Sequence, residues 1–325
     1  MKKWIIVLIA AATVGIFSGC DNQSPAPSSN SAPKKFRIGF VGGRANDYWS
    51  LVRFGCDTAV LTLGNVDLDF RTPSGHTLAD QQLVLSNLVA SGVQAVALSP
   101  IDSEAASAFL NLVPTNVLLV CADNDAPNSQ RAAYIGTDNV AAGMQAAELL
   151  KAALPEGGKV VLLVGTQDAQ NARDRIQGIK NGLAGSKIEI VDLMTDAMNP
   201  GAALENAQKA LVKYPDLAGM VGLFSYNGPA SCMAVHSAGK VGQVKIVCFD
   251  ANAETLAGIS NGEIYGAVAQ SPYKIGQRTI TTIAKYLGGD KNVLAGGKIF
   301  VPTHVITKEN VNEYIPQALN GASEQ

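Results

Sequence analysis

Short apolar runs alternate with longer segments of helical periodicity from Phe36 almost to the end of the chain. In residues 77–92, for example, Leu85 and Leu88 share one helical face, and Gly92 is placed to end the helix. Such alternation predicts parallel sheets whose strands are connected by crossover helices. The apolar runs are nearly continuous, which indicates sheets covered by helices on both faces. The expected strands are residues 37–41, 66–70, 93–99, 116–123, 132–136, 159–165, 188–193, 217–224, 244–250 and 265–270.

The number of expected strands indicates more than one sheet. Ten strands would make a single twisted sheet unusually large, and sheets tend to split near that size, so we expect two lobes. A chain of 325 residues with 47% hydrophobic residues can bury a core in each lobe. The 25 basic residues are balanced by 27 acidic ones, so neither a nucleic-acid partner nor a polybasic membrane contact is expected.

The first residues differ in kind from the rest of the chain. Two lysines and a short apolar run predict a secretory signal peptide over residues 1–19 and therefore export to the periplasm or another extracytoplasmic face. Ser18 and Gly19 directly before Cys20 resemble the bacterial lipobox, which implies acylation of Cys20 and a membrane anchor. The alternative is that Cys20 is only a small apolar residue at the end of the signal. Residues 20–35 are rich in proline, serine and asparagine and are expected to be a flexible tether.

The sequence predicts no metal site, no cofactor and no catalytic centre. Three histidines occur without paired spacing, which disfavours zinc. Gly39, Gly42 and Gly43 do not form the G-x-G-x-x-G pattern of dinucleotide sites, and neither a G-x-S-x-G elbow nor a Walker lysine is present. We therefore expect a protein that is not an enzyme. The remaining cysteines lack C-x-x-C spacing and are expected to be buried free thiols: Cys56, Cys121, Cys232 and Cys248.

The loop FVGGRANDYWS, residues 40–50, has two interpretations. Its glycine pair resembles a phosphate cradle, whereas Asn46, Tyr48 and Trp49 suit an uncharged, flat ligand such as a sugar ring. Tyr48 and Trp49 could equally be core residues at the start of a helix. Arg44 could be solvated or could attract an acidic ligand.

Polar residues follow most of the expected strands. In open parallel sheets, ligands bind beyond the carboxyl ends of the strands, so these residues are the candidates for a binding site. They are mainly amides, carboxylates and an arginine, which exchange hydrogen bonds with hydroxyls and so suit a polyol. The set comprises Asn46, Ser99, Asp102, Asp123, Asn124, Asp125, Thr137, Asp138, Asn139, Gln167, Asp168, Arg173, Ser225, Tyr226, Asn227, Asp250, Asn252 and Gln270.

Several polar residues near these strand ends also have a structural interpretation. Asp102, Asp138 and Asn252 precede helical segments and can serve as N-caps. Arg175 can pair with a carboxylate between helices. These alternatives stay open at the level of sequence.

Taken in order, the segments NDYW, SPIDSEA, YIGTDNVAAG, FSYNGPA and CFDAN resemble the periplasmic sugar-binding proteins of the ribose-binding type, from Phe36 to about Ile306. The resemblance implies an α/β fold of the periplasmic-binding-protein type I class: two doubly wound parallel-sheet lobes joined by three crossover strands. The crossovers would fall near Thr137, Gln270 and Phe300. The implied lobes are residues 36–137 with 271–300, and residues 138–270 with 301–318.

The resemblance also implies a set of ligand contacts. Tyr48 and Trp49 would form one wall of a sugar slot, while Asn124 stands where ribose binders commonly have an arginine. Either Tyr226 or Asn227 would occupy a position where the family often has an amide. Position by position, the implied contacts are Asn46, Tyr48, Trp49, Asp123, Asn124, Arg173, Tyr226, Asn227, Asp250 and Gln270.

The function implied by the resemblance is that of a substrate-binding lipoprotein of an ABC importer. It would capture a monosaccharide or similar polyol between the lobes by hinge closure and deliver it, as a monomer, to the permease subunits. The alternative is a sensor subunit that presents a sugar or furanosyl signal to a chemoreceptor or histidine kinase. The effector domain of a transcription repressor shares the fold, but here a signal peptide replaces the DNA-binding headpiece.

Overall fold

The computed structural model describes residues 35–43, 45–75 and 77–314. The predicted signal peptide over residues 1–19 and the predicted lipidation of Cys20 lie outside the described residues. So do Arg44 and the end of the second predicted lobe, residues 315–318.

The described residues form two six-stranded sheets. The first has the order β11-β5-β4-β3-β1-β2 and the second has the order β12-β10-β9-β8-β6-β7. Each sheet with its helices is called a lobe below, the first lobe and the second lobe. The first sheet contains β1 (Phe36–Val41), β2 (Val66–Arg71), β3 (Ala95–Leu98), β4 (Leu118–Ala122), β5 (Ala133–Gly136) and β11 (Lys298–Phe300). The second contains β6 (Gly158–Val164), β7 (Ile188–Thr195), β8 (Leu217–Gly222), β9 (Lys245–Phe249), β10 (Gly266–Ala269) and β12 (His304–Thr307).

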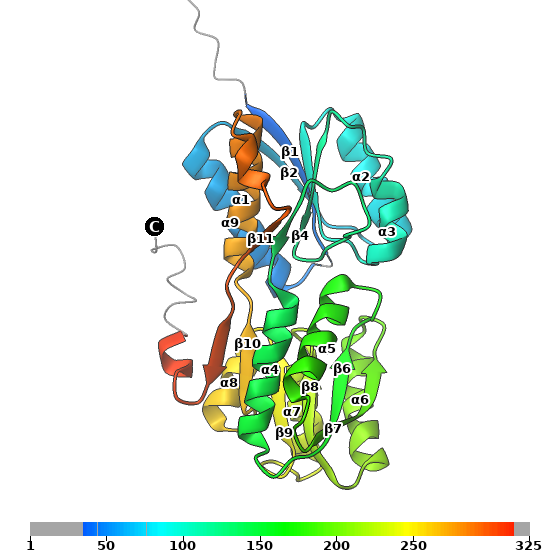
Figure 1. The fold of residues 1–325 in the computed structure, drawn as a ribbon, viewed down its shortest axis with the longest axis vertical. Helices are drawn as coiled ribbons and strands as arrows, with labels where there is room; N and C mark the ends of the chain where they lie inside the picture. Colours follow the sequence, from blue (N-terminus) through cyan, green and yellow to red (C-terminus); the bar gives the residue numbers. More distant parts are fainter. Residues whose placement is uncertain (1–34, 44, 76, 315–325) are drawn as a thin grey trace, which may run out of the picture. The chain divides into compact units, whose positions relative to one another are not determined.

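Helices cover both faces of each sheet (Figure 1). In the first lobe, α1 and α9 pack on one face, and α2 and α3 on the other. In the second lobe, α4 and α5 cover one face, and α6, α7 and α8 the other. The helices are α1 (Asp47–Leu63), α2 (Leu78–Ala90), α3 (Ser103–Leu110), α4 (Asn139–Ala153), α5 (Gln170–Leu183), α6 (Pro200–Lys213), α7 (Asn227–Ser237), α8 (Ala253–Asn261) and α9 (Pro272–Leu287), with a 3₁₀ turn at Lys291–Leu294.

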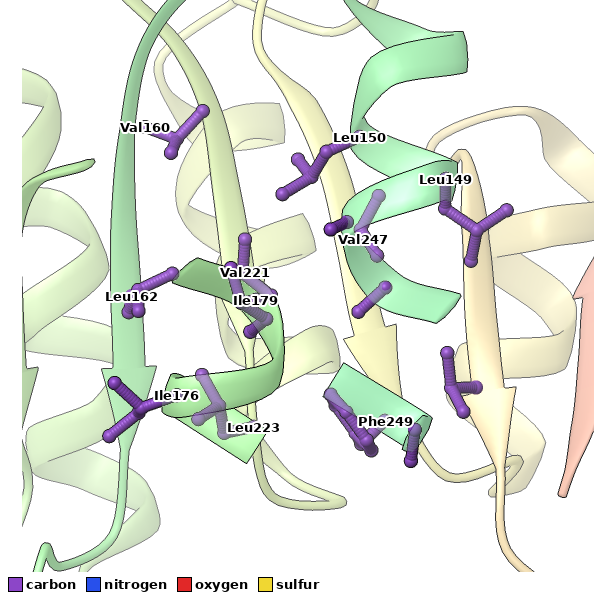
Figure 2. Packing of buried hydrophobic residues seen from close by; sticks show 14 of the residues in the cluster. Leu149, Leu150, Val160, Leu162, Ile176, Ile179, Val221, Leu223, Val247 and Phe249 are labelled. Atoms are coloured by element: carbon purple, nitrogen blue, oxygen red, sulfur yellow. The ribbon is translucent and has the colours of Figure 1, made fainter. Parts of the chain in front are cut away.

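The core of the second lobe shows why its strands read as continuous apolar runs. Leu150 of α4 and Ile179 of α5 pack against Leu162 of β6, Val221 of β8 and Phe249 of β9 (Figure 2). All five side chains are fully buried. Strand residues that point the other way contact α6 and α7, so both faces of the sheet are apolar.

All ten expected strands form, with ends that differ by at most two residues from those predicted. Strands β11 and β12 were not expected from the sequence, because they are short, largely exposed and lack an apolar run. Parallel sheets were expected throughout, whereas β12 pairs antiparallel with β10. The reason is topological: β10 runs toward the point where the chain leaves the second lobe, and β12 runs away from the point where it returns.

The chain passes between the two sheets after β5, after β10 and after β11. The predicted fold class is therefore confirmed, apart from the antiparallel edge strand. Among the described residues, no helix is long and apolar enough to span a bilayer.

The cysteines at 56, 121, 232 and 248 are free thiols. Three of them are buried, as predicted, while Cys232 is only partly so. Burial raises the pKa of the Cys121 and Cys248 thiols to about 12, which makes them poor nucleophiles at neutral pH.

Candidate ligand-binding site

A cavity of about 120 Å³ lies between the carboxyl ends of the strands of the two sheets. The first lobe contributes residues from the loops after β1, β3 and β4, and the second lobe contributes residues from the loops after β6 to β10. This is the position at which open parallel sheets bind ligands. The lining residues are Gly43, Asn46, Tyr48, Trp49, Ser99, Pro100, Ile101, Asp123, Asn124, Thr166, Ala169, Asn171, Arg175, Met198, Phe224, Ser225, Tyr226, Asp250 and Gln270.

Two buried aspartates occupy equivalent places in the two lobes. Asp123 follows β4 and Asp250 follows β9, and both backbones are left-handed, with φ of 67° and 70°. Each backbone N–H donates across to the neighbouring strand, to the carbonyl of Ile135 in the first lobe and of Val268 in the second, at 3.0 Å. Residues other than glycine rarely adopt this backbone, and such strain is commonly retained where it orients a functional side chain.

The carboxylate of Asp123 already accepts two hydrogen bonds. Ser99 Oγ donates to it at 3.0 Å, and the Tyr48 hydroxyl donates to its other oxygen. Burial raises the pKa of Asp123, although these bonds and Arg175 oppose the rise. Burial likewise raises the pKa of Asp250, again opposed by Arg175.

The glycines of the loop after β1 make room for Trp49. A Cβ atom on Gly42 or Gly43 would collide with the indole ring of Trp49. Neither glycine has a left-handed backbone, so close packing explains them, rather than a phosphate cradle. Tyr48 and Trp49 meet edge to face at 5.7 Å, and both line the cavity while packing against the core of the first lobe. The two interpretations of this aromatic pair are therefore compatible.

Asn46 also has two roles in the structure. Its side chain lines the cavity, and its Oδ1 atom accepts from the backbone N–H of Trp49 at 3.0 Å, which caps α1. The caps predicted at Asp102 and Asp138 are present too: the Asp102 carboxylate accepts two backbone N–H groups in the first turn of α3, and the Asp138 carboxylate accepts one in the first turn of α4. Asn252 caps α8 in the same way.

The arginine of the second lobe that lines the cavity is Arg175 and not the predicted Arg173. Arg173 lies outside the cavity and donates to the backbone carbonyls of Gln167 and Asp168 at 2.9 and 2.8 Å. Arg175 is 1% exposed and lines the cavity. The two residues are neighbours in the pattern R-x-R, but an α-helix turns by about 100° per residue, so residues two apart face in different directions.

The guanidinium of Arg175 is held on one side and free on the other. Its Nε atom donates to Asn139 at 2.9 Å, one terminal nitrogen donates to the carbonyl of Leu223 at 2.6 Å, and the group lies 4.4 Å above the ring of Phe249. The other terminal nitrogen has no partner among the described residues. A buried donor without a partner is costly, so it fits a ligand oxygen in the cavity.

Of the pair at the start of α7, only Tyr226 reaches the cavity. Asn227 is fully buried beside it, where it accepts from the backbone of Phe224 at 3.0 Å and donates to Asp196 at 2.8 Å. Asp196 also accepts from the Tyr226 hydroxyl at 2.7 Å. Asn227 therefore lies outside the cavity lining and supports Tyr226 through Asp196.

Phe224 and Met198 line the second-lobe side of the cavity next to Tyr226. The sequence analysis missed Phe224 as a site residue, although its place directly after an apolar strand was a usable signal. It also missed Arg175, Thr166 and Asn171.

Gln270 connects the second lobe with the first crossover. Its amide donates to Asp250 at 2.9 Å, and its carbonyl oxygen accepts from Thr137 at 2.9 Å. Thr137 and Gln270 directly follow β5 and β10, so this bond joins two of the three segments that cross between the lobes. Asn124 lines the cavity, but Pro100 and Asn171 occupy both of its polar groups.

The remaining chemistry of the site is that of a binding pocket. Within residues 35–43, 45–75 and 77–314, no cluster of histidine, cysteine and carboxylate side chains could hold a metal ion. Among the described lining residues, the charged groups are two carboxylates and one guanidinium, with amides, hydroxyls and aromatic rings around them. Such groups can bind a hydroxyl-rich molecule by hydrogen bonds and cover its apolar face.

Fold and cavity together define a two-lobed α/β binding protein. The sequence profile described as periplasmic binding protein domain matches residues 38–291, and the chain belongs to this family. This family is one of binding proteins and not of enzymes.

Individual relatives agree with this assignment. The ribose import binding protein RbsB of Bacillus subtilis is 26% identical over 301 residues, which cover 90% of this chain and 95% of the relative. The putative rhizopine-binding protein of Rhizobium meliloti is 26% identical over an alignment of 338 positions, which covers 97% of this chain and 99% of the relative. Among solved structures, GanP, a glucose-galactose binding protein from Geobacillus stearothermophilus, has 26% identity and a TM-score of 0.80, covering 85% of this chain and 99% of GanP.

Proposed function

We propose that this protein is the sugar-binding component of an ABC importer, with a monosaccharide or similar polyol as its ligand. The observation that carries the proposal is the pair of buried aspartates, Asp123 and Asp250, facing one cavity with the partly unpaired guanidinium of Arg175. Carboxylates accept from hydroxyls and guanidinium donates to them, so the three groups can bind several hydroxyls at once.

The aromatic residues support a ring-shaped ligand. Tyr48 and Trp49 form one wall, and Phe224 with Tyr226 lines the second-lobe side. Aromatic faces cover the apolar C–H face of a sugar ring, while its hydroxyls meet polar groups around the edge. The relatives named above include binders of ribose and of glucose and galactose, which supports the same ligand class.

The proposed ligand contacts are those of the sequence analysis with two changes. Arg175 replaces Arg173, and Asn227 is left out because its side chain supports Tyr226 instead. The set is Asn46, Tyr48, Trp49, Asp123, Asn124, Arg175, Tyr226, Asp250 and Gln270.

Capture occurs, in this proposal, by hinge closure about the three crossovers, between a first lobe of residues 36–137 and 271–300 and a second of residues 138–270 and 301–318. A ligand that contacts both lobes gains its full set of interactions only when they are closed, and it therefore shifts the population toward the closed form. The permease then recognises the closed form. Export, acylation of Cys20 and a monomeric state complete the proposal and rest on the sequence.

A thermal-shift screen of the full chain tests the proposal. The panel holds pentoses, hexoses, inositols and amino acids, and we expect a neutral polyol to raise the melting temperature. Binding to the folded state alone adds about 2.7 kcal/mol of stability at a ligand concentration a hundred times Kd.

Two variants make the screen specific to the cavity. Asp250→Asn removes a buried carboxylate of the site and should abolish the shift, while Asp216→Asn removes an exposed carboxylate of the same lobe and should keep it. No shift with any neutral polyol would contradict the sugar assignment, and a shift with an amino acid would reassign the ligand class.

A further inference from the structure

The N-terminus of α5 lacks a capping side chain of its own. Its N-cap position is Ala169, whose methyl group accepts no hydrogen bond. The first backbone N–H groups of a helix have no partner within the helix and need an acceptor elsewhere. Asn, Asp or Thr side chains supply that acceptor locally in α1, α2, α3, α4, α6 and α8.

For α5 the acceptors come from the other lobe. Ser103 Oγ accepts from the backbone N–H of Gln170 at 2.8 Å, and Asn124 Oδ1 accepts from that of Asn171 at 2.9 Å. Ser103 is 1% exposed and Asn124 is 3% exposed, so water does not compete for these bonds in this state. The helix that carries Arg175 is therefore capped across the cleft.

The capping is reciprocal. Ser103 is the first residue of α3, and its own backbone N–H donates to the carbonyl of Asp168 in the second lobe at 3.0 Å. Arg173 donates to that same carbonyl at 2.8 Å and to the carbonyl of Gln167 at 2.9 Å, which holds the loop before α5 in place. This contact gives a role to the arginine that lies outside the cavity.

We propose that Ser103 and Asn124 form a clasp that favours the closed state by capping α5 from the first lobe, with Arg173 positioning the loop that completes it. The clasp rests on the hinge closure of the proposed function. Opening the lobes removes the acceptors from Gln170 and Asn171. Because Ser103 does not line the cavity, its part of the clasp acts in the same way whichever ligand is bound.

Amide hydrogen exchange of the ligand-free full chain tests the clasp directly. Ser103→Ala should speed exchange at the Gln170 amide by roughly 2- to 30-fold, the range that corresponds to loss of one helix cap. Ser107→Ala is the matched control, because Ser107 lies on the same helix, is also buried, and donates within α3 to the carbonyl of Ser103 at 2.9 Å. It should leave Gln170 unchanged.

A second variant removes the side chain that holds the Asp168 carbonyl in place. Arg173→Met should speed exchange at the Ser103 amide, since the Asp168 carbonyl loses its support. Gln170 exchange that is equal in the wild type, Ser103→Ala and Ser107→Ala would overturn the clasp. The clasp favours the closed form even without ligand, so the measurement needs no ligand and stands even if the sugar assignment fails.

Affinities for D-ribose and D-galactose separate a clasp from a ligand contact. Ser103→Ala should weaken the binding of each probe that binds by the same factor, because the lost bond belongs to closure and not to a hydroxyl of the sugar. A loss confined to one of two binding probes would overturn the proposal, since it would make Ser103 a ligand contact.

Discussion

The buried guanidinium of Arg175 has hydrogen-bond partners in the protein and still offers a donor to a ligand. Asn139 and the carbonyl of Leu223 fix its orientation, and Phe249 lies beneath it, yet one nitrogen remains without a partner among the described residues. Hydrogen bonds to a charged group contribute about 1.5 to 3 kcal/mol each, so this donor can contribute substantially to affinity.

We expect Arg175→Met to weaken binding of the ligand found in the screen by roughly tenfold or more. Methionine keeps much of the apolar packing on Phe249 but removes the donor. Titration calorimetry measures the loss, and far-ultraviolet circular dichroism checks that the variant folds. Arg173→Met is the matched control, with the same substitution on the same helix but no contact with the cavity, and its loss should be smaller. A larger loss in Arg173→Met than in Arg175→Met would count against Arg175 as the donor to the ligand.

At the scale of elements, glycines set how closely helices pack. Gly143 of α4 and Gly178 of α5 face each other, and a Cβ on Gly178 would collide with the carbonyl oxygen of Val140. A Cβ on Gly143 would collide with the carbonyl oxygen of Arg175. The same arrangement joins α1 and α9 through Gly55 and Gly276. Close packing of α4 and α5 thereby helps to fix the position of α5, and with it that of Arg175.

Gly178→Ala should lower the free energy of unfolding by about 1 to 2 kcal/mol. Alanine favours a helix over glycine by about 1 kcal/mol, but the backbone collision forces the helices apart, and overpacking costs about 1 to 3 kcal/mol in addition to lost contacts. Urea unfolding measures the change. Gly201→Ala in the first turn of α6, where the nearest atom is Asn199 Oδ1 at 3.3 Å, should be neutral or slightly stabilising. Equal stabilisation by both substitutions would refute the packing argument.

For the whole molecule, the buried carboxylates couple the cavity to global stability. Burial raises the folded-state pKa of Asp123 above its unfolded value, despite hydrogen bonds from Tyr48 and Ser99. The folded protein therefore binds more protons than the unfolded chain between those two pKa values. Its free energy of unfolding consequently falls as pH rises from about 3.9 through the folded-state pKa.

Asp123→Asn removes this contribution. The stability of the wild type minus that of the variant, measured by urea unfolding at a series of pH values, should fall as pH rises through the window. Asp216→Asn gives the opposite sign: its hydrogen bond to Lys159 lowers the Asp216 pKa, so that contribution is lost as pH falls. A flat difference curve for Asp123→Asn would count against a raised pKa at the cavity.

Prediction from sequence succeeded where the signal was local. Each apolar strand could be predicted from its own residues alone, and the caps at Asp102 and Asp138 could be predicted from the turn that follows each of them. Eight of the polar residues expected at the strand ends line the cavity, because topology brings the carboxyl ends of parallel strands together. Prediction failed for β11 and β12, whose short exposed segments form strands only through pairing partners distant in sequence.

The sequence by itself determined the two-lobed α/β fold, since alternating apolar strands and helices can be buried in few other ways. Only the tertiary structure decided which arginine faces the cavity, because Arg173 and Arg175 differ in direction around α5 and not in type. It also decided that Asn227 supports Tyr226, and that α5 is capped by Ser103 and Asn124 from the other lobe. Such contacts depend on where distant segments meet, and no local pattern encodes them.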